Sequence, residues 1–390
     1  MDAIEILLIS LQVLIGYNLV LPAFLFLIWK SRKVAQHSIP VAFEPSYAIV
    51  VTAYEQIDLI PAVIDSILKL NYSDFIVYIV ADKCDTSSLN FVSEKVVLLK
   101  PPVTLASNTR SHQYAIEHFV KKHDYITIID SDNLVHKEYL NELNKQFSLG
   151  YKAVQGIREA KNLNTSYACL DAARDLYYHF YDGKLLFELG SSSTLSGSGM
   201  AFELKLYQDF LKENDVKGAG FDKVLQAWIV EKDFRISFAG NAIVYDEKTS
   251  ASGQLVQQRS RWINTWFKYF RLGFRLIKLS IANSSSKNQL FFGLIVLRPP
   301  LFIFLLLSLL SLTLNLIFGH FIISVIWLVS WALFIGFFLL SLYYQDVDPR
   351  IISSLRNIPK FIFFQILSLI NVRKANRISV ATKHQVKHES

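Results

Sequence analysis

The chain has 390 residues and a formal net charge of +7, and 52% of its residues are hydrophobic. This composition excludes an ordinary soluble enzyme, because the apolar share is too high, while the length allows one sizeable α/β domain with further segments. The two cysteines, Cys84 and Cys169, exclude a disulfide framework and a cysteine-based metal site.

The N-terminal segment is an apolar run without a charged residue, from position 6 to position 29. At about 1.5 Å per residue, such a helix would cross a hydrocarbon core of roughly 30 Å. A cleaved signal peptide is the alternative, but it requires a basic start and a cleavage site. Here the acidic Asp2 and Glu5 precede the run and Lys30 follows it. We therefore predict a transmembrane anchor over residues 1–33.

Short β-rich runs alternate with helical patterns between residues 45 and 250. The runs are YAIVVT from Tyr47, FIVYIVA from Phe75 and YITII from Tyr125. Near-continuous apolar strands between helices are typical of a parallel sheet that is covered on both faces. We therefore predict an α/β domain with a mostly parallel sheet. Ligands of such sheets bind beyond the carboxyl ends of the strands.

Carboxylates follow two of these predicted strands directly. Asp130 and Asp132 could hold Mg²⁺ or Mn²⁺ through oxygen ligands and bridge it to a diphosphate, although solvated Asp-x-Asp turns are also common. Asp82 could accept hydrogen bonds from a pyrimidine base or a ribose, or merely form a turn. Farther along, Gly197-Ser198-Gly199 would let the backbone approach a ligand, or it lies in a plain loop.

Basic residues and aromatics recur together from residue 254 to residue 281, which predicts an amphipathic helix at the headgroup boundary. This stretch contains Gln258-Arg259-Ser260-Arg261-Trp262, and positions 258, 261 and 262 share one face of a helix. That face offers an amide, a guanidinium for pyrophosphate oxygens and an indole for stacking on a sugar. Boundary aromatics with snorkelling arginines would explain the composition but not the pattern.

The C-terminal part contains two more apolar runs, 301–318 and 321–343, which we predict to form a membrane hairpin that turns at Gly319. Basic residues flank the outer ends of this hairpin, so the region between the first and second spans should face the cytoplasm. Residues 361–370 are apolar and are followed by Arg373, Lys374 and Arg377. They predict an in-plane helix or a re-entrant segment. The expected units are the anchor 1–33, the domain 45–250, the interfacial helix 254–286, the hairpin 299–343, and the cytoplasmic helix and basic tail 344–390.

The order of these motifs resembles membrane-bound family 2 glycosyltransferases, the group that includes cellulose, chitin, hyaluronan and poly-N-acetylglucosamine synthases. The resemblance covers roughly Tyr47 to Trp266 and includes Thr52-Ala53-Tyr54-Glu55, which is similar to the family's first-strand motif. It implies a GT-A-type nucleotide-sugar-binding domain with a divalent cation. It also implies inverting sugar transfer in polysaccharide biosynthesis, at the cytoplasmic face of a bacterial inner membrane.

The resemblance also implies a role for each matching residue. Asp222 is the expected catalytic base. The expected donor-binding residues are Thr52, Glu55, Asp82, Asp130 and Arg261, the expected acceptor-binding residues are Gly197, Ser198, Gly199, Gln258 and Trp262, and the expected metal ligands are Asp130 and Asp132. Two positions depart from the family's pattern. Phe221 replaces the Glu that normally precedes the base, and His112 lies where a phosphate-facing Lys is expected.

The expected partners are a nucleotide sugar, with a UDP-sugar first among them, a saccharide or lipid-linked acceptor, and membrane lipid. Nucleic acid is not expected, because the basic residues cluster beside membrane segments without a docking motif. Synthases that export their product have more spans than the three predicted here, so export would require a partner or an oligomer. The alternative function is a catalytically inactive membrane scaffold that binds nucleotide sugars through the same fold.

Overall fold

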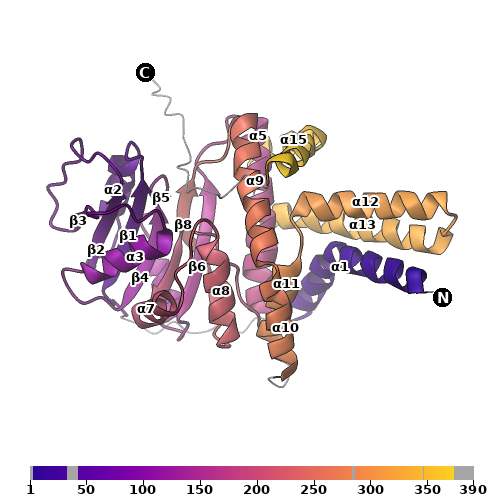
Figure 1. Ribbon diagram of the computed structural model, residues 1–390, viewed down its shortest axis with the longest axis horizontal. Coiled ribbons are helices and arrows are strands. Elements are labelled where there is room, and N and C mark those ends of the chain that lie inside the picture. The colour runs from indigo at the N-terminus through magenta and orange to yellow at the C-terminus, as the bar shows by residue number, and fades with distance from the viewer. Residues whose placement is uncertain (1–2, 33–42, 283–285, 346, 373–390) are drawn as a thin grey trace.

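The computed structural model describes residues 3–32, 43–282, 286–345 and 347–372. An α/β domain occupies one half of the molecule, and three helices project from its side (Figure 1). Asp2 and the basic tail residues Arg373, Lys374 and Arg377 lie outside the described residues.

The described strands form one mixed eight-stranded sheet in the order β3-β2-β1-β4-β7-β6-β8-β5. They are β1 (Tyr47–Tyr54), β2 (Phe75–Asp82), β3 (Val96–Leu99), β4 (Tyr125–Asp130), β5 (Leu134–Val135), β6 (Ala153–Ala160), β7 (Met200–Glu203) and β8 (Ile236–Asp246). The predicted α/β class is confirmed, but the prediction of a mostly parallel sheet was wrong. The short strand β7 runs antiparallel to both β4 and β6. Apolar character shows that a strand is buried but not in which direction it runs.

Both faces of the sheet are buried, as the apolar runs predict. In β1, Ile49 and Val51 face α2 (Ile60–Leu68) and α4 (Tyr139–Phe147). The alternate residue Val50 belongs to the core on the other face. That core includes residues of α3 (Asn108–Glu117), α7 (Leu204–Glu213) and α8 (Phe221–Glu231). This two-sided packing fixes the register of the strands.

The register brings polar strand ends to one edge of the sheet. Tyr54 at the end of β1 is opposite Asp82 of β2, and Thr52 is opposite Asp130 of β4. Because these three strands are parallel, the side chains that follow them meet at the same edge. This edge positions the candidate site.

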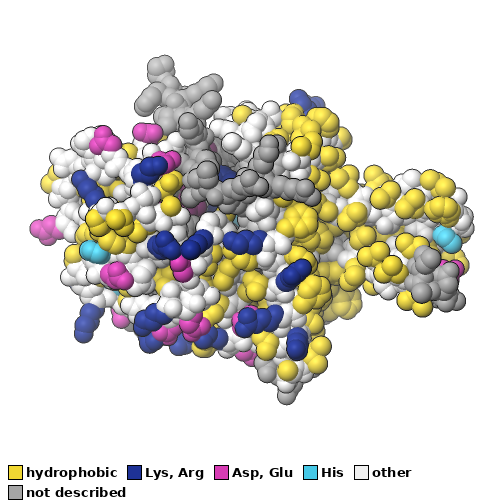
Figure 2. Space-filling model, in the orientation of Figure 1, with side chains coloured by type: hydrophobic (Ala, Val, Ile, Leu, Met, Phe, Trp, Pro, Cys, Tyr) yellow, Lys and Arg dark blue, Asp and Glu magenta, His cyan; other side chains and the backbone are white. Residues whose placement is uncertain are grey.

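The projecting helices are α1 (Ala3–Ser31), α12 (Leu301–Ile317) and α13 (Phe321–Tyr343). Two of them, α1 and α13, are long and apolar enough to cross a membrane. A third span is counted only when α12 is joined to α11 (Lys287–Leu297), a pair that is bent by 75°. Hydrophobic side chains cover the projecting helices, whereas Lys and Arg lie mainly on the α/β domain and its neighbouring helices (Figure 2). This distribution is consistent with membrane association.

A buried ion pair ties the projecting helices to the domain. Arg298, just before α12, donates to both carboxylate oxygens of Asp182, and the Nη1–Oδ1 distance is 2.8 Å. Asp182 lies in the π-helical segment η1, which continues α5. The helices near this ion pair and after α13 are α5 (Ser166–Tyr178), η1 (His179–Leu185), α6 (Leu186–Glu188), α14 (Pro349–Ser354) and η2 (Leu355–Asn357).

Two helices, α9 (Ser252–Tyr269) and α10 (Arg271–Ala282), occupy the stretch for which one amphipathic helix was predicted. After the break at Phe270, α10 packs closely on α11, since a Cβ on Gly273 would lie 2.6 Å from a backbone oxygen of α11. The predicted in-plane segment forms α15 (Ile358–Asn371), which packs along α9. Ser260 Oγ donates to the Ser368 carbonyl at 2.8 Å across that contact.

Candidate active site at the carboxyl edge of the sheet

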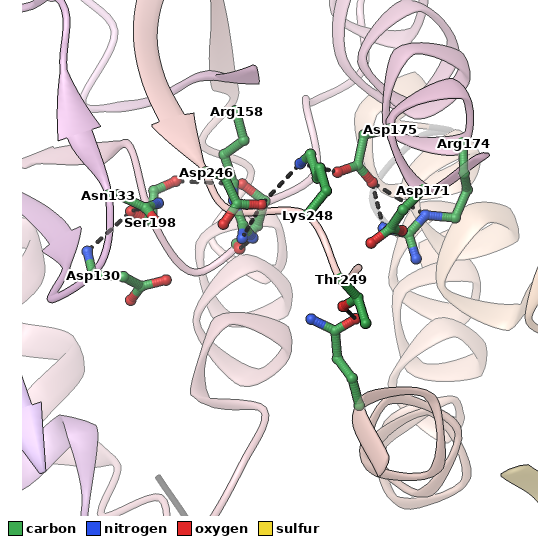
Figure 3. Close-up of polar contacts among 12 residues, drawn as sticks. Asp130, Asn133, Arg158, Asp171, Arg174, Asp175, Ser198, Asp246, Lys248 and Thr249 are labelled. Atoms are coloured by element: carbon green, nitrogen blue, oxygen red, sulfur yellow. Dashed lines mark hydrogen bonds and ion pairs between the residues drawn. The ribbon is translucent and has the colours of Figure 1, made fainter. Parts of the chain in front are cut away.

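The end of β4 is fastened to the glycine-containing loop before β7. The backbone N–H of Asp130 and the side-chain amide of Asn133 both donate to Ser198 Oγ, at 3.0 and 2.8 Å (Figure 3). Gly197 and Gly199 have φ angles of 90° and 66°, which side-chain-bearing residues rarely adopt. The sequence places all three loop residues in acceptor binding. The structure brings the loop to Asp130, but Ser198 is fully buried and its hydroxyl faces the protein.

Four carboxylates converge beside β4. Burial, the charge of Asp132 and then the charges of Asp246 and Asp222 raise the pKa of Asp130 to about 7, while the Arg158 guanidinium opposes them. The contribution of Asp222 means that this residue, far away in the sequence, lies within electrostatic reach of Asp130. We call Asp130, Asp132 and Asp222 the acid edge.

Asp222 lies in the first turn of α8, with 17% of its side chain exposed. Lys223 Nζ is 3.2 Å from Asp222 Oδ2 and also donates to the Leu195 carbonyl at 3.2 Å. Gly220, which precedes the helix at φ 97°, has no room for a side chain, because a Cβ would lie 2.6 Å from Thr265 Cγ2 of α9. The start of α8 is therefore pressed against α9, so Asp222 lies beside the helix that carries the Gln258–Trp262 motif.

Two residues of the acid edge, Asp130 and Asp132, fit the role of ligands to a divalent cation. Among the described residues, no group of three His, Cys, Asp or Glu side chains is arranged to hold a metal ion. The charge of Asp132 is nevertheless close enough to raise the pKa of Asp130. Oxygen-binding cations such as Mg²⁺ are often held by one or two carboxylates, with water and substrate phosphates as the other ligands. The donor set therefore suits such an ion together with a diphosphate.

The predicted donor-binding residues of β1 and β2 lie at the same edge, with different surroundings. Asp82 is buried, and its carboxylate accepts hydrogen bonds from the backbone N–H groups of Leu105 and Ala106 at 2.9 and 2.7 Å. It therefore orders the loop before α3. Glu55 forms an exposed ion pair with Lys83 at 2.6 Å, and both residues have positive φ. Backbone strain of this kind is concentrated at functional sites.

The motif residues of α9 differ in exposure. Thr249 Oγ1 donates to Gln258 Oε1 at 3.2 Å. Arg261 is partly buried, and burial lowers the pKa of its guanidinium. Trp262 is 41% exposed, and the guanidinium carbons of Arg259 and Arg174 lie 4.1 and 4.4 Å from the centre of its ring system.

A set of buried ion pairs beside the acid edge is absent from the sequence prediction. Lys248 Nζ contacts Asp175 Oδ2 at 2.6 Å and Asp246 Oδ2 at 2.8 Å, and Asp246 also contacts Arg158 at 2.8 Å (Figure 3). On α5, Asp171 contacts Arg174 at 3.0 Å. We call the set the ion network; its members are Arg158, Asp171, Arg174, Asp175, Asp246, Lys248 and Arg259. In the sequence, the feature that could have indicated the ion network is the group of charged residues on α5, at positions 171, 174 and 175.

The cations of the network outweigh burial for two of its three acids, whereas burial raises the pKa of the third, Asp171, to about 6. Burial alone would raise the pKa of Asp175, but Arg174 and Lys248 more than offset this, so its pKa lies below the ordinary value. The same balance, with Arg158 and Lys248 as the cations, lowers the pKa of Asp246. These carboxylates therefore remain charged within the fold.

His112 does not face a phosphate site. It is buried, its Nδ1 lies 2.7 Å from the Tyr207 hydroxyl, and burial lowers its pKa to about 3. Its ring lies 5.3 Å from the ring of Phe221, the residue directly before Asp222. The two positions that depart from the family's pattern are thus in contact, as a neutral pair in the core.

Comparisons with known proteins show the family and the fold. Residues 45–265 match the profile described as glycosyltransferase like family 2. Among solved structures, the mannosyltransferase PcManGT from Pyrobaculum calidifontis, in complex with GDP-Man and Mn²⁺, has a TM-score of 0.52 at 14% identity, over 94% of this chain and 99% of that one. S. aureus TarS in complex with UDP-GlcNAc has a TM-score of 0.40 at 15% identity, over 84% and 89% of the two chains. No curated protein sequence matches the chain.

Proposed function

The chain belongs to the glycosyltransferase like family 2, and on this premise we propose that it is an inverting glycosyltransferase of the bacterial inner membrane. It moves a sugar from a nucleotide sugar to a saccharide or lipid-linked acceptor at the cytoplasmic face. The observation that carries the proposal is the position of Asp222 in the first turn of α8, where the start of that helix packs against α9. The effect of the Asp132 and Asp222 charges on the pKa of Asp130 supports a single site for the base and the metal ligands.

The donor is held at the carboxyl edge of the sheet. Asp130 and Asp132 would hold a divalent cation, which would supply positive charge beside the departing diphosphate. Arg261 of α9 adds a guanidinium toward the same phosphates. A UDP-sugar is the first candidate, and GDP-Man is the second because the archaeal mannosyltransferase of similar fold binds it. Thr52 and Glu55 contribute to donor binding from β1, while Asp82 supports it by ordering the loop before α3.

Asp222 acts as the general base. Its carboxylate takes the proton of the acceptor hydroxyl while that oxygen attacks the anomeric carbon, on the side opposite the leaving nucleotide. The Lys223 ammonium keeps this carboxylate in place. Its Nζ lies 3.2 Å from Asp222 Oδ2 and donates to the Leu195 carbonyl at 3.2 Å. The acceptor lies between the base and α9, with Gln258 and Trp262 as its contacts and the backbone of Gly197-Ser198-Gly199 on the other side.

The proposed reaction takes place next to lipid. In support, α1 and α13 are long and apolar enough to cross a membrane, and with α12 beside them they would anchor the chain. Basic residues near the ends of these helices favour a cytoplasmic position for the α/β domain.

The direct test is a donor screen on the purified full chain in detergent. UDP- and GDP-sugars are supplied with Mn²⁺ or Mg²⁺ and with chito-oligosaccharides or polyprenyl phosphate, and released nucleotide is measured. We expect release from one donor that depends on the cation and is lost in Asp132→Asn. Asp209→Asn, which changes an exposed aspartate paired with Lys205 on α7, is the matched control and should retain release. Absence of release from every donor and acceptor pair would refute the transferase.

A second candidate is the inactive scaffold, which the neutral His112–Phe221 pair favours because both residues replace charged ones of the family's pattern. It predicts that a nucleotide sugar raises the melting temperature of the wild-type chain without any release of nucleotide. The same donor screen, run with a thermal-shift readout, separates the two candidates.

A further inference from the structure

Two cations contact the ring of Trp262. Two guanidinium groups, those of Arg259 and Arg174, lie within 4.4 Å of its ring centre, and yet 41% of the residue is exposed. Cations over an aromatic face attract the ring electrostatically. The indole is therefore fixed in direction while part of its surface stays open.

One of the two guanidiniums that contact the indole, that of Arg174, comes from α5, outside every motif that the sequence singled out. Asp171 of α5 is 3% exposed, and its Oδ1 contacts both Arg174 Nη2 and Arg259 Nη2. One carboxylate oxygen thus brings both guanidiniums to the same place. The Nε and Nη1 groups of Arg259 are buried without a hydrogen-bond partner in the described structure. Asp171 and Trp262 therefore determine where this guanidinium lies.

The neighbouring aromatics of α9 are arranged differently. One turn farther on, the ring of Trp266 stacks on Phe270 at 5.1 Å and contacts Phe267 at 4.9 Å. Phe267 is 52% exposed. These rings form an apolar cluster of the kind expected beside lipid. The cation-held Trp262 is distinct from this cluster, so a boundary role does not explain its surroundings.

We propose that Asp171 and Arg174 are positioning residues that hold Trp262 as the surface against which the acceptor sugar stacks. Asp171 gathers the two guanidiniums, and Arg174 and Arg259 hold the indole. The inference rests on the proposed transferase function, and it assigns to α5 a part in acceptor binding.

The test compares acceptor kinetics in Arg174→Gln, Trp262→Ala and the double variant. With a chito-oligosaccharide as the acceptor, each single change should raise the acceptor KM by about 3- to 30-fold, the range expected when a contact worth as much as a cation–π interaction is lost. A wild type that uses only polyprenyl phosphate, which carries no sugar, would overturn the stacking role. The KM for the nucleotide sugar should not change. The double variant should be no worse than Trp262→Ala alone, because both changes act on one surface. Arg174→Lys should recover part of the loss, and Phe267→Ala is the control that leaves the acceptor KM unchanged.

A spectroscopic arm does not depend on activity. The difference in near-ultraviolet circular dichroism between the wild type and Trp262→Phe isolates the signal of this tryptophan from those of the other five. Arg174→Gln should remove most of that signal, and Arg174→Lys should retain part of it. An unchanged signal, or additive effects on the acceptor KM, would overturn the positioning role. If no donor is turned over by the wild type, the transferase proposal fails, while the spectroscopic arm still decides whether Arg174 fixes the indole.

Discussion

The acid edge and the ion network adjoin each other, yet the pKa values of Asp130 and Asp175 are shifted in opposite directions. At the acid edge, like charges and burial raise the pKa of Asp130 to about 7. In the ion network, two cations keep the pKa of the buried Asp175 below its ordinary value. In the network, oppositely charged side chains contact one another directly. At Asp130, burial and like charges outweigh the Arg158 guanidinium, and carboxyl groups with a strongly shifted pKa are often found at functional sites. The comparison therefore favours ligand chemistry at the acid edge and a supporting role for the network.

The largest effect should come from Asp222→Asn, which tests the acid edge as a catalytic site. Loss of a general base typically lowers the rate by about 10² to 10⁴. The amide keeps the shape of the side chain, so nucleotide-sugar binding should persist, and removal of a like charge near Asp130 should leave the melting temperature unchanged or raised. Turnover, nucleotide titration and thermal unfolding measure the three quantities. Near-normal turnover would remove Asp222 from the mechanism.

The next effect should come from Lys248→Met, which tests the ion network as a structural unit. The side chain of Lys248 is 1% exposed and contacts both Asp175 and Asp246. Its removal leaves two buried carboxylates without this cation, and breaking a buried pair in this way typically costs about 3–5 kcal/mol. The free energy of unfolding should fall by this order.

Lys205→Met is the matched control for Lys248→Met. It removes a cation from the exposed Lys205–Asp209 pair, and exposed pairs contribute at most about 1 kcal/mol. Equal losses of stability in the two variants would contradict the division between the two regions.

A smaller effect should appear in the pH dependence of cation binding. Because the pKa of Asp130 is raised to about 7, its carboxyl is largely protonated at pH 6 and must lose that proton to bind a metal. The affinity for Mn²⁺ should therefore fall about tenfold per pH unit below pH 7. In the absence of metal, the folded state retains this proton at pH values where the unfolded chain has lost it. The contribution of Asp130 to stability should thus decrease as the pH rises from about 4 to about 7.

Mn²⁺ should reverse this loss, since it binds the ionised form. Thermal unfolding between pH 5 and pH 8 measures the predicted loss of stability without Mn²⁺ and its reversal with Mn²⁺. Asp130→Asn should abolish both effects. A Mn²⁺ affinity that is constant across this range would mean that the Asp130 carboxyl is not a ligand.

The sequence predicts most of what is local and apolar. The runs from Tyr47, Phe75 and Tyr125 became adjacent strands because continuous burial on both faces leaves a clear pattern. Asp130 and Asp132 could be singled out because they follow one of those runs directly. The direction of β7 could not be predicted, because it depends on how the chain re-enters the sheet rather than on the residues of the strand.

The ion network was missed for a different reason. Asp171 and Arg174 appear in the sequence as charges on a helix, which usually face solvent, and only the packing of α5 against α9 buries them. For Asp82 and His112, too, the surroundings depend on contacts between distant parts of the chain, which the sequence does not show. Their positions along the chain suggest contact with a ligand, but tertiary structure directs Asp82 to the backbone of residues 105–106 and places His112 in the core.

The smallest effect concerns the neutral pair His112–Phe221, which lies next to the acid edge and belongs to neither region. The family's pattern has Lys and Glu at these positions, and here the two rings are 5.3 Å apart. Both residues here are neutral, and Phe221 directly precedes Asp222. His112→Lys and Phe221→Glu should each lower the free energy of unfolding by about 1–3 kcal/mol, since each places a polar or charged group in the core. The double variant should lose less than the sum, with a coupling of about 1 kcal/mol, because the new ammonium and carboxylate can pair. Urea unfolding of the four proteins measures the coupling.

His112→Lys combined with Phe119→Glu is the control, because Phe119 packs on Tyr78 instead, and the effects of these two changes on the free energy of unfolding should add. If the first pair is also additive, the two positions do not form a unit, and the neutral contact has no bearing on how the base is held.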